Sequence, residues 1–442
     1  MRNTYRPGVI EYDISILNYN GEFANIKKIV AEFNIYEDIF SNVLKADFLI
    51  DDALGLPETL PIVGDEIIQV EFRTDQSLER VKLKFRTYKL DKRVISEERQ
   101  HIYALYAVSE EMYDSILTFA DNHFVGQTPD GITRSIFGEY LSNGGKNLET
   151  ESAINKITTT SAGHHPFEYI NMIAKEAQSD QYTDSSYYIF YEDHKGFKFK
   201  TINQLLNADP VEDYYLADPT AGEDVESDRS DLRRYQIISA LSFNSSFDIM
   251  KGLTGGMMDT TVGYIDPIMK KYEESTFKYL SDFNKLSNMP GGRAILPASG
   301  KFATTEGTGH MRMVATDWND ESTQTFDDRI NESTDPHKFH SSKRWKYYHN
   351  GVALLQSLHQ YGINITVPGN SEIKCGDCIN IFIPQNSPVT TDAARYLKLY
   401  GQRQPKFLVT AVLHNYKQTT GEYYTTIQGV KQSFGKEPTA EA

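Results

Sequence analysis

The stretch 33–40 reads Phe-Asn-Ile-Tyr-Glu-Asp-Ile-Phe, and part of it returns later in the 442-residue chain. Its frame of Phe-Asn, three residues and then Asp-Ile recurs at 243–249, so each matched position has a residue number higher by 210. One short match is weak evidence, but self-similarity within a chain is the usual mark of a duplicated structural unit.

Two further matches follow in the same order along the chain. The matched segments are Gly64-Asp65-Glu66-Ile67 with Gly376-Asp377-Cys378-Ile379, and Lys84-Phe85 and Val108 with Lys406-Phe407 and Val430. The residue numbers differ by 312 in the first of these matches and by 322 in the second. The step from 210 to 312 implies an insertion in the second copy, running roughly over 256–358. We therefore expect two related β-domains, the second of them interrupted.

The region 1–108 has the pattern of consecutive strands. Strands are expected at 12–17, 26–36, 43–50, 67–72, 81–90 and 101–108. Ile68, Val70 and Phe72 alternate with Gln69 and Glu71, which is typical of a strand with one buried face. This region is predicted to be an antiparallel β-domain.

The period becomes helical after Ser109. Three helices are predicted. The first starts at Ser109 and has Met112, Ile116, Leu117 and Ala120 on its buried face, and the second spans 132–141. The third starts at Pro166, and its buried residues are Phe167, Ile170, Ile173, Ala174 and Ala177. A hairpin is expected over 187–191 and 196–200. Residues 209–231 hold nine acids against the single base Arg229, which indicates a solvated linker.

These patterns predict a mixed β fold with α+β additions. The expected division is a first β-domain at 1–108, a helix-rich α+β domain at 109–208, an acidic linker at 209–232, a second β-domain at 233–255 with 359–435, an insertion domain at 256–358 and a tail at 436–442.

The composition excludes several classes of protein. The net charge of -16 disfavours a chain-wide basic surface for nucleic acid, although a local patch remains open. Aromatic residues make up 12% of the chain, which is unlike a disordered sequence. No signal sequence and no run of 18 apolar residues is present, so no membrane insertion is expected.

Cys375 and Cys378 form a CxxC motif and are the only cysteines. Such a motif can be a redox pair or half of a zinc site. Here a strand pattern rather than a helix follows it, and the first copy has Val63 and Glu66 at the matching positions. We therefore expect these residues to pack rather than to react.

Histidines offer two weaker candidates for a metal site. His337 and His340 have the i, i+3 spacing of a helical metal site, with Asp335 and His349 nearby. They lie in a polar, loop-like stretch, and the adjacent pair His164-His165 at a helix start would point in different directions. No metal ligand is predicted from either group.

A mixture of cations and aromatics lies at the end of the insertion. It consists of Lys338, Lys343, Arg344 and Lys346 among Trp345, Tyr347 and Tyr348. This mixture is typical of single-strand binding sites, but without a second such patch a protein contact is favoured. Gly307-Thr308-Gly309 lacks the third glycine of a dinucleotide loop, and no other catalytic signature is present. No catalytic, cofactor or metal residues are predicted, and no enzyme is expected.

Taken together in order and spacing, several segments resemble the central baseplate hub protein of contractile-tailed bacteriophages, which is related to the hub part of type VI secretion spikes. The segments are 33–40, 60–67 (Leu-Pro-Ile-Val-Gly-Asp-Glu-Ile), 165–168 (His-Pro-Phe-Glu), 188–191 (Tyr-Ile-Phe-Tyr), 365–371 (Ile-Thr-Val-Pro-Gly-Asn-Ser), 375–383 and 406–416.

The resemblance implies that both β-domains are tube-forming antiparallel β-barrels and that the chain forms a homotrimer with a pseudo-hexameric ring. The implied partners are a central spike protein and a tail tube or tube-adaptor protein, with baseplate wedge and tape-measure proteins as further candidates. Double-stranded DNA would only pass through the channel during genome ejection and host cell entry. The implied location is the tail baseplate of a virion assembled in the host cytoplasm.

A different class of function stays open from the sequence. The acids and histidines of 256–358 would suit a virion-associated or secreted hydrolase with this insertion as its catalytic element.

Overall fold

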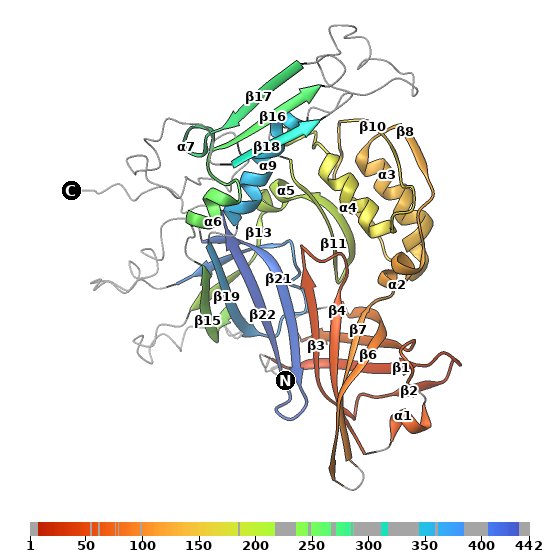
Figure 1. Cartoon of the computed structure of the whole chain (residues 1–442). Helices are drawn as coiled ribbons and strands as arrows, with labels where there is room; N and C mark the ends of the chain where they lie inside the picture. Colours follow the sequence, from red (N-terminus) through yellow and green to blue (C-terminus); the bar gives the residue numbers. More distant parts are fainter. Residues whose placement is uncertain are drawn as a thin grey trace, which may run out of the picture.

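A computed structural model of the chain describes residues 8–432, with gaps at 54, 61, 76, 78, 98–99, 184–185, 217–235, 246–248, 267–270, 284–285, 287–310, 317–343, 359–360 and 384–404. The fold is mostly β, as expected (Figure 1). No helix in these described ranges is long and apolar enough to cross a bilayer.

The N-terminal part is a run of antiparallel strands. Its elements are β1 (Ile10–Leu17), β2 (Phe23–Asn25), β3 (Val30–Asp38), β4 (Lys45–Asp52), α1 (Leu56–Thr59), β5 (Ile67–Thr74), β6 (Val81–Glu97) and β7 (Gln100–Ser109). They lie in the order β3-β4-β7-β6-β5-β1-β2. Ile68, Val70 and Phe72 are all buried, which confirms the predicted alternation. We call this set the first run.

A helical region follows. Its elements are α2 (Glu110–Leu117), β8 (His123–Gln127), α3 (Pro129–Ile136), a π turn (Phe137–Leu141), a 3-10 turn (Ser142–Gly144), β9 (Leu148–Thr150), β10 (Ile157–Thr160), α4 (Pro166–Glu176), β11 (Tyr188–Asp193), β12 (Gly196–Thr201) and α5 (Ile202–Asn207). The predicted hairpin is β11–β12, and the predicted buried residues of α4 and of Ala177 after it are confirmed.

The predicted face of α2 is wrong in part: Ala120 is buried and Met112 is partly buried, as expected, but the other two residues are not. The helix ends at Leu117, and Ile116 and Leu117 are 54% and 78% exposed. Its buried residues are Glu111 and Ser115 instead. Glu111 turns inward because a lysine from the loop before β9, Lys146, pairs with it there. The ion pair between Glu111 and Lys146, which is distant in the sequence, therefore decides which face of α2 is buried, and the apolar pattern of the helix does not.

The C-terminal strands form a second run. They are β13 (Pro210–Leu216), β14 (Ile237–Ile238), β15 (Ala240–Ser245), β19 (Tyr361–Pro368), β20 (Cys378–Phe382), β21 (Lys406–Lys417) and β22 (Glu422–Lys431). Their order is β15-β19-β22-β21-β20-β13-β14. β13 lies inside the stretch predicted as an acidic linker, so that part of the prediction is wrong: Tyr214 packs into the core while the acids flank it.

The two runs share one strand order. Each strand of one run has a counterpart at the same position in the other. The first run has the order β3-β4-β7-β6-β5-β1, and the second has the order β15-β19-β22-β21-β20-β13. β6 and β7 place Arg86 opposite Val108, and β21 and β22 place Leu408 opposite Val430, so the residue numbers in both strands differ by 322 between the copies. Even the register shift between Thr87 and Lys89 recurs between Val409 and Ala411. The copies also differ: β1 pairs with β5 antiparallel and β13 with β20 parallel, and the pairing of β6 with β7 has two further register shifts, after Asp91 and after Ile95, that the pairing of β21 with β22 lacks.

β21 joins the two runs into one 14-stranded sheet. Its residues 411–417 pair with β3, while its first residues pair with β20 (Figure 1). Among the described strands, neither run closes on itself, so the sheet is open and the predicted barrels are not confirmed.

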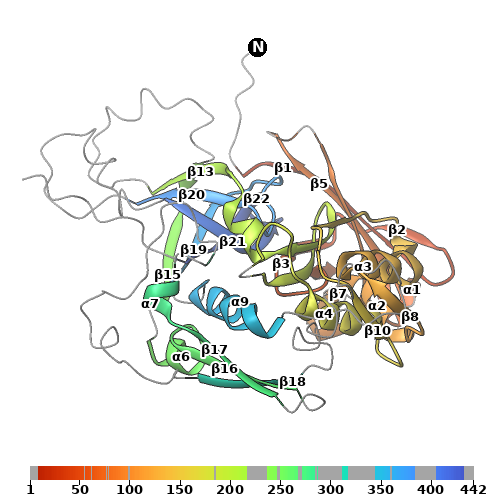
Figure 2. The same ribbon diagram turned by 90° about the horizontal axis from the view of Figure 1, so that it is seen from above.

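The described part of the insertion forms a separate layer. It contains β16 (Thr260–Asp266), β17 (Lys271–Phe277), α7 (Tyr279–Asp282), β18 (Met311–Thr316) and α9 (Arg344–Leu358), and α6 (Ile249–Thr254) comes just before it in the chain. The three strands form their own sheet in the order β17-β16-β18. α9 lies between that sheet and the second run, and it contacts β16, β19 and β22 (Figure 2).

Replacing Val70 with Asp tests the core of the first run. Val70 is fully buried, so a carboxyl group there loses its hydration without a partner. We expect a loss of about 4 kcal/mol of stability, measured as a lower urea midpoint by circular dichroism. Lys84→Asp places the same residue on an exposed position of the neighbouring strand and should shift the midpoint little. Equal shifts in both variants would contradict the assigned core.

Candidate functional site

Three distant segments meet at one buried junction. β3 and β21 pair there, and the β11–β12 hairpin packs against β3. The hairpin turn, His194-Lys195, reaches the contact between the two runs, and the loop before β20 closes it through Cys375. The junction is therefore where the first run, the helical region and the second run are held together.

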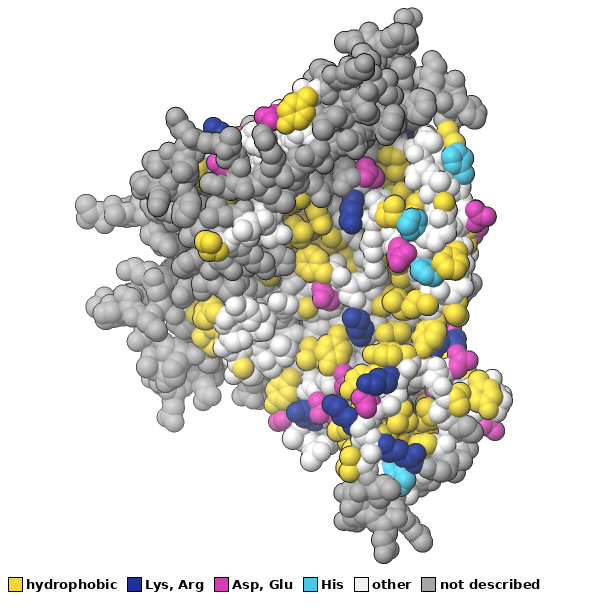
Figure 3. All heavy atoms as spheres, viewed as in Figure 1, with side chains coloured by type: hydrophobic (Ala, Val, Ile, Leu, Met, Phe, Trp, Pro, Cys, Tyr) yellow, Lys and Arg dark blue, Asp and Glu magenta, His cyan; other side chains and the backbone are white. Residues whose placement is uncertain are grey.

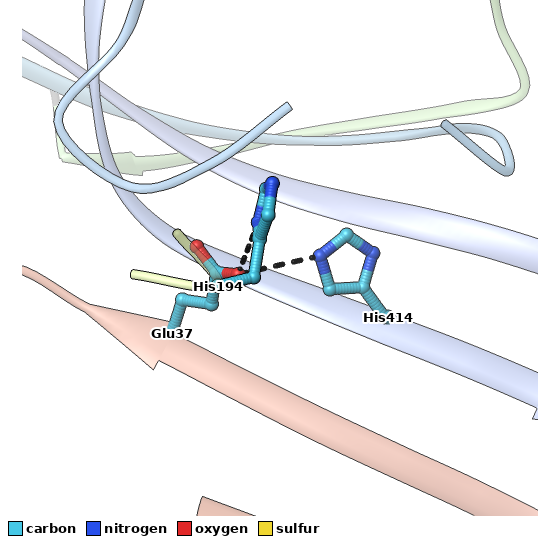
Figure 4. A group of neighbouring side chains, drawn as sticks. All are labelled: Glu37, His194 and His414. Atoms are coloured by element: carbon cyan, nitrogen blue, oxygen red, sulfur yellow. Dashed lines mark hydrogen bonds and ion pairs between the residues drawn. The ribbon is translucent and has the colours of Figure 1, made fainter. Parts of the chain in front are cut away.

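Glu37 of β3 is the centre of this junction. One carboxylate oxygen, Oε1, lies 2.8 Å from His194 Nδ1 and 3.8 Å from His414 Nε2 (Figure 4). The other oxygen accepts the backbone N–H of Cys375 at 3.0 Å. Glu37 is 1% exposed, and the side chains of His194 and His414 are 4% and 1% exposed. One buried carboxylate thus binds three separate segments.

His414 is oriented from its other side. Its Nδ1 lies 2.7 Å from the hydroxyl of Tyr423, a fully buried residue of β22. Within the described part of the chain, its Nε2 has no hydrogen-bond partner inside normal distance and faces Glu37. The Tyr423 contact therefore fixes the direction in which this imidazole points.

The ionisation of this cluster follows from its contacts. Burial alone would raise the pKa of Glu37, but the two imidazoles outweigh it and hold that pKa well below its usual range. Burial alone would lower the pKa of His194, but the Glu37 carboxylate outweighs it and raises that pKa. The group is thus a buried ion pair between Glu37 and His194.

The same three residues form the group of possible metal ligands in the described ranges. One ligand atom from each lies within 4.8 Å of the others, and two imidazoles with a carboxylate suit a transition metal. Most polar atoms of these three side chains already have a partner within the protein. Glu37 pairs with His194, His414 contacts the Tyr423 hydroxyl, and Glu37 accepts the backbone N–H of Cys375. The arrangement itself is that of a buried contact that holds β3, the β11–β12 hairpin and β21 together.

A second buried cluster adjoins the first. Lys146 Nζ lies 2.7 Å from Glu111 Oε2 and 2.5 Å from Glu192 Oε1. The other oxygen of Glu192 accepts the N–H of Leu44 at 2.9 Å. Burial and the nearby Glu111 raise the pKa of Glu192, although Lys146 opposes them. Burial lowers the pKa of Lys146, but the two carboxylates more than reverse this. This cluster holds together helix α2, the loop before β9, the hairpin and the segment that leads into β4.

A third cluster continues along the hairpin. Lys374 Nζ lies 3.1 Å from the buried Asp193, and Lys198 Nζ lies 3.9 Å from it. Lys198 also binds Glu149 at 2.5 Å. Burial raises the pKa of Glu149, but Lys198 and Lys200 bring it down to about 2. Lys374 belongs to the second run, so this cluster also bridges the hairpin to that run.

Two open clefts lie on either side of the hairpin turn, and His194 and Lys195 line both. Their volumes are about 330 and 810 Å³. Charges of both signs line them, including Lys82 in both, Glu110 in the smaller and Glu372 in the larger. On the described part of the face in Figure 3, hydrophobic, charged and histidine side chains also intermingle over the helical region. The charges of this site are arranged as pairs that join segments.

The CxxC residues are buried and free. The thiol of Cys375 faces the carbonyl of Glu192 at 3.7 Å, and that of Cys378 faces the carbonyl of Leu205 at 3.1 Å. Burial raises the pKa of Cys375 well above its usual value and that of Cys378 to about 11. These thiols therefore pack as neutral groups, which agrees with the expectation from the repeat.

Of the histidine candidates, the structure describes His164, His165 and His349. His165 is the N-cap of α4, where its side chain and that of Glu168 form a capping box. His349 is buried on α9 beside Phe277. His337, His340, Asp335, Lys338, Lys343 and Gly307 to Gly309 lie outside the described residues, as do the side chains of 344–348.

Sequence reasoning did not single out the residues of the Glu37 cluster, although a signal existed. Glu37 follows the buried Phe33 and Ile35 at spacings of two, so it occupies the inward face of a strand. His414 stands in the same way between the buried Val412 and Tyr416. An ionisable residue on the apolar side of an alternating strand indicates a buried partner.

Solved structures of tail proteins share this fold. The tail protein of Neisseria meningitidis MC58 is 10% identical with a TM-score of 0.54, and the match covers 96% of this chain and 98% of that one. The 43 kDa tail protein of prophage MuSo2 from Shewanella oneidensis is 10% identical with a TM-score of 0.52, over 96% and 100%. A type VI secretion system component from Escherichia coli, described as similar to bacteriophage T4 tail proteins gp27 and gp5, is 11% identical with a TM-score of 0.41, over 93% and 76%.

No family model matches the chain, and neither does any curated protein. The resemblance to tail proteins inferred from the residues is confirmed at the level of the fold.

Replacing Lys146 with Met tests the second cluster. The side-chain stem is kept, while Glu111 and Glu192 lose their shared cation. We expect a loss of about 3 kcal/mol at pH 8. Lys146 lowers the pKa of Glu192 in the wild type, so in the variant that pKa rises further above its unfolded value, and proton uptake as pH falls stabilises the folded variant more than the folded wild type. The deficit should therefore be smaller at pH 5.

Urea midpoints at the two pH values measure this effect. Lys89→Met is the matched control, because its ion pair with Asp91 is exposed to solvent, which screens it, and its loss should change stability little. A Lys146→Met deficit no larger than that of the control would contradict a buried, coupled cluster.

A thiol reagent such as Ellman's reagent tests the two cysteines. Burial and the raised pKa of both thiols predict no labelling of the native chain and labelling of both residues in guanidinium chloride. Val63→Cys provides the control, because Val63 is the counterpart of Cys375 in the first copy and is 68% exposed. Only that third thiol should react in the native protein; rapid native labelling of the wild type would refute the packing role.

Proposed function

We propose that this chain is a structural, non-enzymatic component of a tail baseplate. In this role it is the central hub: a homotrimer that forms a pseudo-hexameric ring, adapts the hexameric tail tube to a trimeric central spike and lines part of the channel for genome delivery. The observation that carries the proposal is the shared strand order of the two runs, down to the same register shift.

Symmetry explains why a duplicated unit suits such a role. Three chains with two equivalent units each present six similar units around one axis, whereas the whole chains repeat only three times. One face can therefore match a six-fold tube and the other a three-fold spike. A tail location is supported by the tail proteins that share this fold.

The proposed domains follow the two runs. The first is 1–108 and the second combines 233–255 with 359–435, each a barrel-type unit of a tube wall. The helix-rich domain 109–208 lies between them, and β13 is added to the second unit because it pairs with β20. The insertion 256–358 covers the second run through α9. Proposed partners are the central spike, the tube or its adaptor, and the wedge and tape-measure proteins.

Mass and shape in solution test the proposal. We expect multi-angle light scattering to give three times the chain mass of 50.3 kDa and negative-stain images to show a ring with a central channel. A chain that stays monomeric at high concentration, with and without a spike partner, would overturn the proposal. A cell-wall zymogram that shows a clearing band from this chain, lost on deletion of 256–358, would favour the hydrolase instead.

A further inference from the structure

The buried junction between the two runs contains a set of side chains with the chemistry of a metal site. Glu37 of β3, His194 of the hairpin turn and His414 of β21 each supply one possible ligand atom, and these atoms lie within 4.8 Å of one another. Two imidazoles and a carboxylate are a donor set that zinc and other divalent transition metals bind. We infer that Glu37 Oε1, His194 Nδ1 and His414 Nε2 bind one such ion, which joins the two runs and the hairpin.

The main observation behind this site is the ring nitrogen of His414 that faces Glu37. The side chain of His414 is 1% exposed, and within the described part of the chain its Nε2 has no hydrogen-bond partner. It lies 3.8 Å from Glu37 Oε1, which is too far for a hydrogen bond. A polar atom buried this deeply is rarely left without a partner. A metal ion shared with Glu37 would supply one.

The distances between the ligand atoms are close to those around a bound ion. Two ligand atoms that each lie about 2.1 Å from zinc at the tetrahedral angle are about 3.4 Å apart. Glu37 Oε1 lies 2.8 Å from His194 Nδ1 and 3.8 Å from His414 Nε2, so the two separations bracket that value. The two imidazole planes are 76° apart, so the rings approach the carboxylate from different directions (Figure 4). Side-chain shifts of about 0.5 Å would complete the coordination.

The groups behind the ligands orient them for this role. The Tyr423 hydroxyl lies 2.7 Å from His414 Nδ1. When Nδ1 carries the proton of this ring, the lone pair is on Nε2 and is directed toward Glu37. The backbone N–H of Cys375 donates to Glu37 Oε2 at 3.0 Å, which leaves Oε1 for the ion. Hydrogen bonds to the far side of a ligand are the usual means of fixing its tautomer and orientation in a metal site.

The charges around the junction favour a cation. Burial raises the pKa of the Cys375 thiol beside Glu37, and the Glu37 carboxylate raises it further. Asp193 and Asp38 act in the same direction, while Lys374 opposes them. Carboxylates therefore outweigh the lysine at this place, and a divalent cation would offset their charge.

His194 gives an ion a route to the site. It lines both clefts beside the hairpin turn, which have volumes of about 330 and 810 Å³. The ion takes the place of the proton between His194 and Glu37: the N–H bond at His194 Nδ1 breaks, the proton passes to water in the cleft, and the lone pair of the nitrogen binds the metal. With three protein ligands, a fourth position remains for a water molecule.

Metal binding by the full chain tests the site. The chain is stripped with EDTA, incubated with excess zinc sulfate or cobalt chloride and desalted, and its metal content is measured by mass spectrometry. We expect one ion per chain. The cobalt form should show the visible absorption of nitrogen and oxygen coordination, without the intense charge-transfer band that a Cys375 or Cys378 thiolate would add.

His414→Gln removes one ligand and should weaken zinc binding at least about tenfold, measured by competition with a chromophoric chelator. His164→Ala is the matched control, because this histidine also lies near a carboxylate, Glu168 at 3.9 Å, but its side chain is 44% exposed. It should keep the wild-type affinity. Zinc should also raise the urea midpoint of the wild type and of His164→Ala, and raise that of His414→Gln less.

A wild-type chain that retains no zinc or cobalt would overturn this site, and so would a thiolate band in the cobalt spectrum. A folded His414→Gln chain with wild-type affinity would overturn it as well. If that variant does not fold, the wild-type metal content and spectrum still decide, with His194→Gln as the second ligand variant. These results do not depend on the number of chains in the assembly, so a failed metal site would leave the hub role intact, and a monomeric chain would leave the metal site intact.

Discussion

The antiparallel pairing of β3 with β21 is the contact on which the rest of the structure depends. It joins segments from opposite ends of the sequence, and without it the two runs would be separate sheets. Backbone hydrogen bonds set the spacing and register of this pairing, while Phe33, Tyr416 and Tyr12 pack across it. Because β21 also pairs with β20 and β22, the position of the whole second run follows from this one contact.

Buried charges specify how the hairpin of the helical region meets that pairing. Glu37, Glu192 and Asp193 are each almost wholly buried and each pairs with a cation from another segment. Removing such charges from water is expensive, and a buried ion pair adds little net stability compared with apolar packing. It does penalise any arrangement that separates the partners. A carboxylate left alone at this depth would cost several kcal/mol, so the three segments fit together in one way.

The same physics explains where reasoning from the sequence succeeded and where it did not. The strands of the first run and the buried face of α4 follow from local periodicity, since each apolar residue buries itself against its own sheet or helix layer. The face of α2 does not, because Lys146 supplies a buried partner for Glu111 that no local pattern reveals. β13 was hidden for a similar reason: the acids around Tyr214 indicate solvent, whereas β20 offers that strand an edge to pair with.

By itself, the sequence determined the duplication and the alternating strands, because short matches in order and periods of two are visible without coordinates. It also indicated that Cys375 and Cys378 are packing residues, through Val63 and Glu66 at their counterparts in the first copy. Only the tertiary structure decided that β21 joins the runs and that Glu37, His194 and His414 share one buried site. Those contacts lie between positions separated by 157 or more in the sequence, and partners so distant are selected by burial and charge pairing in the folded chain, not by local pattern.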